Sequence, residues 1–218
     1  MPPPNDKVAR RVNAEAHERF KAHLVDIARQ IFLTEGPAGV TIRRITAAAG
    51  VTPMAFYWYF DSKDALLSVI WAELLSEASL FCQGRVECLP PTAKADTQLL
   101  AFFEAFVRHW LENRDHFRFI FMCDAHKADF VELRKHLFEE EGCHGYFAPF
   151  FRYSRACFGD TPEGHERAHR LRTLALYRAI GYLHCAITLY NVDMERASSQ
   201  IHDLVDDLRQ TLRLLQSA

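Results

Sequence analysis

The residues best suited to chemistry form an aromatic stretch near the start of the chain. Thr52–Tyr59 reads TPMAFYWY, and its last three residues are a tryptophan flanked by two tyrosines. Tyrosine hydroxyls can donate hydrogen bonds to phosphate oxygens, and aromatic faces can pack on thymine methyl groups and on sugars. An exposed run of this kind is costly in water unless a partner covers it. We therefore expect this stretch to contact DNA.

Two short helices joined by a tight turn are expected to position this stretch. Thr41 can cap a first helix over residues 42–49, because its hydroxyl can accept a hydrogen bond from a free backbone N–H. Gly50 follows where that helix ends, since glycine enters the left-handed region at little cost. Pro53 stands at the first position of the second helix, after a capping Thr52, where its missing N–H costs nothing. This order of residues is typical of a helix-turn-helix.

Longer helices before and after the motif are expected to hold it in place. Residues 13–35 and 63–81 each carry an apolar stripe at helical spacing. Phe56 and Phe60, four residues apart, should anchor the second motif helix to the core that these stripes form. Lys63 lies beside the free N–H groups that begin the following helix, and together they would make a good phosphate site.

The charge distribution agrees with a DNA-facing amino-terminal end. The chain of 218 residues has a net charge of −2, but residues 1–63 hold nine basic and six acidic side chains. This end therefore has the sign that DNA binding requires. Residues 1–12 are rich in proline and then basic. We expect a flexible arm there, which is either a solvated tail or a contact to the DNA backbone or minor groove.

Composition also bears on the compartment and on the class of protein. No apolar run approaches the roughly 18 residues of a membrane span, and the first residues lack the apolar core of a signal peptide. We therefore expect a soluble cytoplasmic protein. The six cysteines are dispersed without a Cys-x-x-Cys pair, which favours reduced thiols in the core. No GxSxG, Walker or GxGxxG motif is present, so the sequence does not indicate an enzyme.

The rest of the chain predicts an all-α body. Strand-like alternation of any length is absent from the sequence, and a breaker stretch over residues 83–96 precedes the later helices. We expect a DNA-binding domain over residues 13–63 and a larger helical domain over residues 64–218. The later helices are predicted over residues 97–113, about 116–123, about 129–158, 164–190 and about 195–216.

One segment carries a family resemblance. Residues 26–70 read DIARQIFLTEGPAGVTIRRITAAAGVTPMAFYWYFDSKDALLSVI. An amphipathic helix ends in phenylalanine before Glu-Gly, a threonine begins a short helix, and Ala-Gly-Val-Thr precedes an aromatic run and an Asp-Ser-Lys link. This pattern resembles the TetR family of one-component regulators over about a fifth of the chain. The resemblance implies a ligand pocket in residues 64–218 and a homodimer whose last two helices form a four-helix bundle.

The resemblance also implies roles for individual residues. Arg43 is similar to the groove-facing residue of the first motif helix. Thr46 stands where alanine is usual and should widen that helix crossing slightly, and Tyr59 replaces a common histidine. Met54 and Ala55 replace a common Gly-Thr pair, so base reading should rest on apolar contacts and on Arg43. The implied base-facing residues are Thr52, Pro53, Met54 and Trp58, and the implied phosphate contacts are Thr41, Tyr57, Tyr59 and Lys63.

The larger domain holds most of the phenylalanines, so the implied pocket should be apolar and aromatic. For any single phenylalanine, however, a place in the core is the simpler interpretation. The polar candidates for orienting a ligand are His109, Asn113, Tyr177 and His184. The candidate aromatic lining is Phe102, Phe106, Trp110, Phe117, Phe121, Phe147 and Phe151.

The sequence therefore predicts a DNA-binding transcriptional regulator. We expect a repressor that binds a near-palindromic operator as a homodimer, with half-sites about one helical turn or a multiple apart, and is released by a small apolar or aromatic effector. No cofactor or metal is expected. One alternative keeps this fold but makes a metal ion or thiol oxidation the trigger. Another is a helical ligand-carrier or interaction protein that does not bind DNA. The candidate residues for the metal or redox trigger are Cys123, His126, His136, Cys143 and His144.

Overall fold

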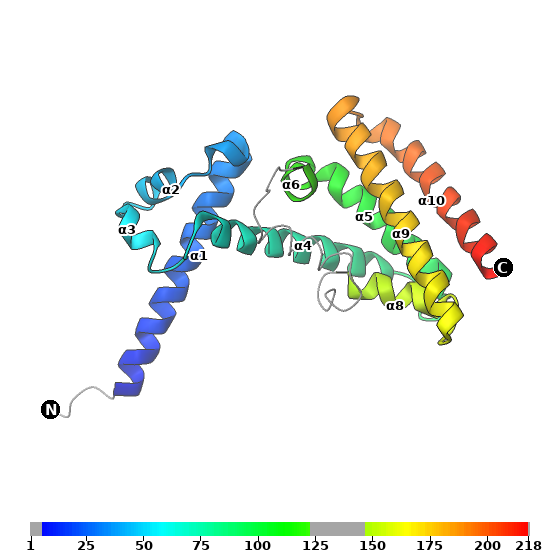
Figure 1. Ribbon diagram of the computed structural model, residues 1–218, viewed down its shortest axis with the longest axis horizontal. Coiled ribbons are helices and arrows are strands. Elements are labelled where there is room, and N and C mark those ends of the chain that lie inside the picture. Colours follow the sequence, from blue (N-terminus) through cyan, green and yellow to red (C-terminus); the bar gives the residue numbers. More distant parts are fainter. Residues whose placement is uncertain (1–5, 123–146, 218) are drawn as a thin grey trace. The chain divides into compact units, whose positions relative to one another are not determined.

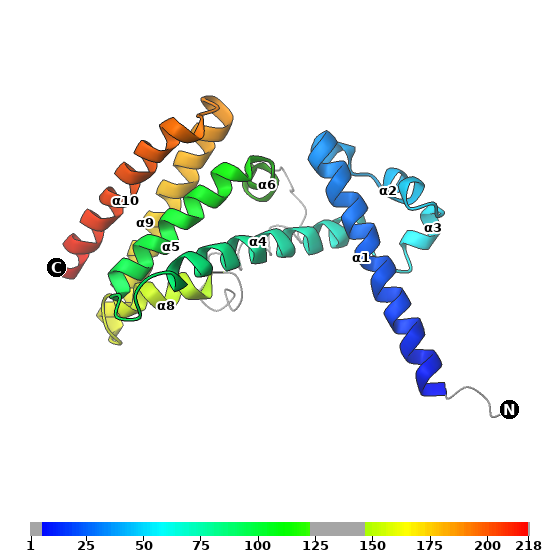
Figure 2. The same ribbon diagram turned by 180° about the vertical axis from the view of Figure 1, so that it is seen from behind.

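A computed structural model describes residues 6–122 and 147–217 of the chain (Figures 1 and 2). No strand occurs within these ranges, so the predicted all-α class is confirmed. The described residues form two compact units, an amino-terminal unit up to Glu73 and a carboxy-terminal unit from Leu74 onward. The division falls inside a helix, α4 (Lys63–Glu87), and so lies further along the chain than the expected boundary after residue 63.

The amino-terminal unit begins with α1 (Asp6–Gly39), which is longer than the helix predicted over residues 13–35. It starts at Asp6 because neither proline nor glycine interrupts residues 6–35. Residues 6–12, expected in a flexible arm, are therefore helical. Gly36 adopts a φ of 71° and breaks the helical path at the point where the predicted helix ends.

Two short helices, α2 (Ile42–Ala48) and α3 (Pro53–Phe56), follow α1 and share a core with it. An ion pair between Arg29 and Glu73 joins α1 to the first half of α4. The predicted apolar stripes supply the buried core of this unit. Its members are Leu24, Val25, Ala28, Phe32, Ile45, Phe56, Phe60, Leu66, Leu67 and Ile70.

Helix α4 extends to Glu87 rather than to residue 81, because Gly84 is accommodated within the helix and the next proline is Pro90. Ser62 caps this helix, and its Oγ accepts a hydrogen bond from the N–H of Ala65 at 3.0 Å. By length and composition alone, α4 could cross a membrane, although the sequence has no unbroken apolar run of that length. Half of its apolar window is buried in the structure, and a single helix of this kind is weak evidence for a span.

The carboxy-terminal unit is built around α5 (Ala95–Glu112), which packs against α8, α9 and α10. Both views in Figures 1 and 2 show α9 and α10 side by side. The aromatic and leucine side chains of α5 are buried on most of its circumference, which makes it the core helix of this unit. The other elements are α6 (Arg114–Phe117), the π-helical segment η1 (Arg118–Met122), α8 (Ala148–Ala156), α9 (Pro162–His184), the π-helical segment η2 (Cys185–Leu189) and α10 (Met194–Ser217).

The predicted helices of this unit are largely found. The prediction over residues 164–190 corresponds to α9 followed by η2, and α9 begins earlier because Thr161 caps it, with its Oγ1 3.0 Å from the N–H of Gly164. Most of the helix predicted over residues 129–158 lies outside the described residues. Its described end is α8, where Pro149 occupies the first turn.

Candidate DNA-binding surface and ligand pocket

The predicted helix-turn-helix is present, with its turn built as expected. Thr41 caps α2, and its Oγ1 accepts a hydrogen bond from the N–H of Arg44 at 3.3 Å. Gly50 adopts a φ of 69° directly after α2, and Pro53 opens α3. Thr52 occupies the cap position of α3 but makes no side-chain capping bond, which leaves its hydroxyl at the surface.

The tip of the motif presents apolar and aromatic groups. Phe56 is fully buried, and its ring lies 5.6 Å from that of Phe60, so these two residues anchor α3 as predicted. On the opposite side, Met54 is 68% exposed, Tyr57 52% and Trp58 73%. Met54, Tyr57 and Trp58, which were predicted to contact DNA, are therefore directed outward.

Tyr59 departs from the expected outward run. Its ring is half-buried on α1, with its centroid 4.6 Å from that of His17 and 5.0 Å from that of Phe20. Tyr59 lies three residues after the buried Phe56, a spacing that brings both side chains to the same face of a helical turn. The exposed aromatic pair is therefore Tyr57 and Trp58, and a phosphate contact from Tyr59 stays a prediction.

The two arginines of α2 are in different situations. Arg44 forms an ion pair with Glu35 at the end of α1. Arg43 is exposed, and within the described part of the chain its guanidinium has no hydrogen bond or ion pair. It remains available to an external anion or base. Lys63 is half-buried in the first turn of α4.

Thr46, which replaces the usual alanine, is almost completely buried. Its hydroxyl donates to the carbonyl of Ile42 at 2.9 Å and lies 3.3 Å from that of Arg43, so its polar group is satisfied within α2. The carbonyl of Thr46 in turn accepts a hydrogen bond from the N–H of Val51 at 2.9 Å. The residue therefore helps to close the turn of the motif.

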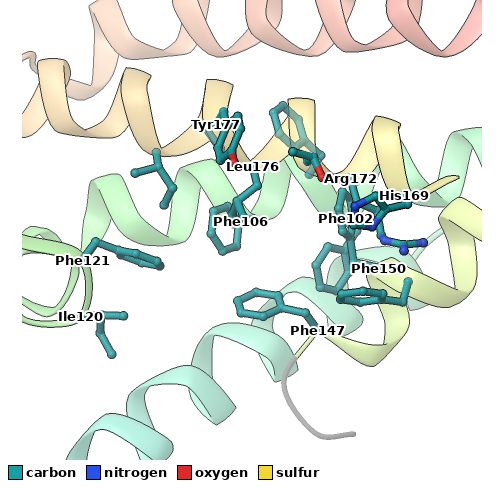
Figure 3. Close-up of a pocket in the computed structure, with 15 residues that line it drawn as sticks. Phe102, Phe106, Ile120, Phe121, Phe147, Phe150, His169, Arg172, Leu176 and Tyr177 are labelled. Atoms are coloured by element: carbon teal, nitrogen blue, oxygen red, sulfur yellow. The ribbon is translucent and has the colours of Figure 1, made fainter. Parts of the chain in front are cut away.

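The carboxy-terminal unit contains a cavity of about 430 Å³ between α5, η1, α8 and α9 (Figure 3). This volume lies in the range of about 300–1,000 Å³ that is usual for small-molecule sites. Most of the wall is phenylalanine and aliphatic side chain. The lining residues are Phe102, Phe103, Phe106, Ile120, Phe121, Phe147, Phe150, Phe151, His169, Arg172, Thr173, Leu176, Tyr177, Ala179 and Ile180.

Several predicted pocket residues line this cavity and others do not. Trp110 and Phe117 are fully buried in the core instead. His109 packs between the rings of Phe81 and Trp110, at 5.3 and 5.0 Å. His184 lies with its Nδ1 3.0 Å from the sulfur of Met122, and Asn113 caps α5 through a hydrogen bond to the carbonyl of His109. The predicted residues that do line the cavity are Phe102, Phe106, Phe121, Phe147, Phe151 and Tyr177.

The side chains that the sequence reasoning missed come mainly from one face of α9. Arg172 is the unexpected member, because it is charged and only 5% exposed. Its Nη1 donates to Ser154 Oγ at 3.3 Å, and its guanidinium lies 4.4 Å from the centroid of the Phe151 ring. The spacing of this face, at residues 169, 172, 173, 176, 177 and 180, is helical and was visible in the sequence.

Comparison with known proteins identifies the amino-terminal segment. Residues 24–70 match the family model described as bacterial regulatory proteins, tetR family. This segment of the chain is of the TetR type. The chain is 33% identical over 127 residues to the transcriptional regulator AcrR of Shigella flexneri, covering 57% of this chain and 56% of AcrR. It is 31% identical over 91 residues to the repressor DhaR of a Mycobacterium strain, covering 41% and 46%.

Solved structures of low sequence identity share the fold of this chain. BioQ of Mycobacterium smegmatis superposes with a TM-score of 0.55 at 18% identity, over 90% of this chain and 98% of BioQ. BioQ has also been solved with its double-stranded DNA operator, and that structure gives a TM-score of 0.53 at 19% identity, over 91% and 98%. The chain spans about half the length of the curated relatives AcrR and DhaR.

Burial is the main cause of the pKa shifts of His109, Cys157 and Cys82 in the carboxy-terminal unit. Burial lowers the pKa of His109 from 6.5 to about 4, with repulsion from His116 adding to the effect and Glu77 opposing it. Burial raises the pKa of the Cys157 thiol to about 11, and it also raises that of Cys82. Both thiols are therefore protonated at neutral pH and are poor nucleophiles.

The structure describes none of the candidate residues for a metal or redox trigger. Cys123, His126, His136, Cys143 and His144 lie outside the described residues. Among the residues that the structure describes, no group of three or more His, Cys, Asp or Glu side chains is placed to hold a metal ion.

Proposed function

We propose that this protein is a DNA-binding transcriptional repressor that acts as a homodimer on a near-palindromic operator and is released by a small apolar or aromatic ligand. The observation that carries the proposal is the outward surface of the helix-turn-helix. Met54, Tyr57 and Trp58 are exposed there beside the unengaged Arg43. Large apolar side chains exposed together need a partner, and the DNA major groove offers thymine methyl groups, sugars and phosphates.

The relatives support a DNA ligand. BioQ, which shares the fold, binds double-stranded operator DNA, and DhaR is a repressor. Thr52, Pro53, Met54 and Trp58 would face the bases, with Arg43 as the main polar probe. Thr41, Tyr57, Tyr59 and Lys63 would contact phosphates. A DNA-binding repressor of this kind would work in the cytoplasm.

The cavity supports control by a ligand. The wall of the cavity is mostly aromatic. The cavity lies in the carboxy-terminal unit, which contains the second half of α4. The first half of α4 belongs to the amino-terminal unit, which contains the helix-turn-helix. A ligand that moves the second half of α4 would also move its first half. Release requires the ligand to bind the DNA-free state more tightly than the DNA-bound state, since equal affinity would shift nothing.

Exposed apolar groups on the last helical segments support a dimer. Tyr177 on α9, Leu189 and Tyr190 around η2, and Leu214 on α10 are all largely exposed. We expect α9 with η2 and α10 to pair with the same elements of a second chain. Two recognition tips would then face one DNA molecule. Sedimentation should give twice the chain mass of 25.1 kDa.

Selection from a random DNA library, followed by fluorescence anisotropy on the selected site, tests DNA binding directly. Arg43→Ala should weaken binding to the selected site by about 1–3 kcal/mol and relax its specificity, and Tyr57→Phe should weaken binding to all sequences. Arg108→Ala is the matched control, because it removes the same charge from α5, where Arg108 pairs with Glu104 at 2.9 Å. The surface assignment is wrong if neither Arg43→Ala nor Tyr57→Phe changes the affinity for the selected site.

The same assay separates the alternatives. A helical carrier that does not bind DNA would select no sequence, and its weak binding would depend on salt alone. A metal- or redox-triggered regulator would lose or gain affinity for the selected site on addition of a chelator, an oxidant or a reductant. The proposed repressor should be insensitive to all three.

A further inference from the structure

Two basic side chains of α1 lie over the segment that links α3 to α4. The His17 ring is stacked on that of Tyr59, with 4.6 Å between the centroids and 27° between the planes. One turn further along α1, the Lys21 ammonium lies 5.5 Å from the centroid of the Phe60 ring. Because His17 and Lys21 are four residues apart, they share one face of α1, which is the face that covers the start of this link.

Neither group is paired with an acid within the part of the chain that the structure describes. His17 is exposed and Lys21 is half-buried, and neither has a hydrogen bond or an ion pair there. Glu18, three residues before Lys21, is exposed and forms no ion pair with it. An imidazole stacked through its face keeps an N–H at the ring edge, and this N–H can donate to an anion in either protonation state.

Tyr59 makes this pair continuous with the proposed DNA-binding surface. It directly follows the exposed Trp58, and the link that begins with it leads to Lys63. The hydroxyl of Tyr59 has no hydrogen bond within the described residues. His17 and Lys21 therefore extend the surface from α3 onto α1 with groups that suit phosphate oxygens.

We propose that His17 and Lys21 bind DNA phosphates beside the recognition helix, so that α1 itself forms part of the DNA-binding surface. This inference rests on the proposed function and adds two contacts to it. His17 donates its N–H to a phosphate oxygen while its ring packs on Tyr59, and Lys21 supplies a positive charge one turn away. Contacts of this kind strengthen binding to every DNA sequence and leave the preferred sequence unchanged.

Anisotropy titrations of the selected DNA site over a series of salt concentrations test Lys21. Lys21→Gln should weaken binding about threefold or more at about 0.1 M salt, and should lower the slope of log affinity against log salt by about one for each Lys21 in the complex. Lys94→Gln is the matched control, because it removes the same charge from an exposed position in the carboxy-terminal unit. No change in Lys21→Gln, or an equal change in both variants, overturns the contact.

His17→Phe separates hydrogen bonding to phosphate from simple support of Tyr59. Phenylalanine keeps a ring that can stack on Tyr59 but has no N–H, so this variant should bind about three- to tenfold more weakly, as expected for one lost hydrogen bond. His23→Phe is the control, since His23 is exposed on the same helix and its ring contacts Phe20, at 6.1 Å. Circular dichroism checks that each variant is folded. Full affinity in folded His17→Phe, or an equal loss in His23→Phe, overturns the role of His17.

Neutral phosphate analogues locate the contact on the DNA. Each phosphate of the selected site is replaced in turn by an uncharged methylphosphonate, and the affinity is measured for the wild type and for Lys21→Gln. At the phosphate that Lys21 contacts, the replacement should weaken binding of the wild type but cost clearly less in the variant, because the pair is already broken. The absence of any such position overturns a direct contact.

Comparison with Arg43→Ala separates this inference from the proposed function. Loss of affinity in Arg43→Ala, but not in His17→Phe or Lys21→Gln, leaves the proposed function intact and overturns the α1 contacts. Loss of affinity in the α1 variants alone supports the α1 contacts and overturns the role of Arg43. A protein that selects no DNA site overturns both.

Discussion

His109 should make the protein less stable as the pH falls through the mildly acidic range. The imidazole is 8% exposed on α5 and lies between the rings of Phe81 and Trp110. Burial lowers its pKa from 6.5 to about 4 in the folded protein. The unfolded chain therefore binds a proton as the pH falls below 6.5, whereas the folded protein does so only near pH 4. Stability from this group is complete above pH 6.5 and is lost progressively toward pH 4.

The size of the effect follows from the two pKa values. At about pH 5, a group that titrates at 6.5 in the unfolded chain and at about 4 in the folded protein lowers the free energy of unfolding by about 2 kcal/mol. Urea unfolding at about pH 7.5 and about pH 5 measures this difference. His109→Gln should show about 2 kcal/mol less acid destabilisation than the wild type, because its amide does not titrate.

A second histidine provides the comparison for this experiment. His202 on α10 is exposed and lies 3.4 Å from Asp206, so His202→Gln should leave most of the acid destabilisation in place. Equal acid destabilisation in His109→Gln and the wild type would refute the reasoning. It would mean that His109 is already charged at neutral pH, or that it is solvated in the folded protein.

Two further stability predictions concern the helix-turn-helix. Phe56→Ala should destabilise the protein by about 3–5 kcal/mol because the ring is fully buried, whereas Trp58→Ala, at a 73% exposed position, should change the free energy of unfolding by less than about 0.5 kcal/mol. Gly50→Ala should cost about 1–2 kcal/mol, because alanine is strained at a φ of 69° although no atom lies within 4 Å of its Cβ. Gly84→Ala, inside α4 with the same open space, should instead stabilise the protein by about 1 kcal/mol. Urea denaturation measures the free energy of unfolding of all four variants. If Gly50→Ala and Gly84→Ala changed that free energy in the same direction, the argument from backbone conformation would be contradicted.

The helix-turn-helix could be predicted from the sequence because its signals are local. Thr41, Gly50 and Pro53 each determine the backbone within a few residues of themselves, and the structure places each in its expected role. Phe56 and Phe60 could be assigned to the core from their spacing alone. The family resemblance added the implied DNA contacts, which the structure of a single chain without DNA leaves as predictions.

The features that could not be predicted depend on distant parts of the chain. Tyr59 reads as the end of an exposed aromatic run, but α1 supplies His17 and Phe20 to cover it. A charged residue within a long helix is usually solvated, so Arg172 gave no sign of burial until α8 placed Ser154 and Phe151 against it. Such contacts join residues that are far apart in the sequence, and no local pattern encodes them.

The continuity of α4 is the physical requirement for any coupling between ligand and DNA. Its first half contributes Leu66 and Ile70 to the core of the amino-terminal unit, and its second half contributes Leu74 and Ala78, both of which are buried. Neither proline nor glycine occurs in α4 before Gly84, so the segment that crosses the division has no intrinsic hinge. A ligand in the cavity would control DNA binding only by changing the position of this helix. Release would therefore depend on the packing of α4 against α5, where Phe81 contacts His109.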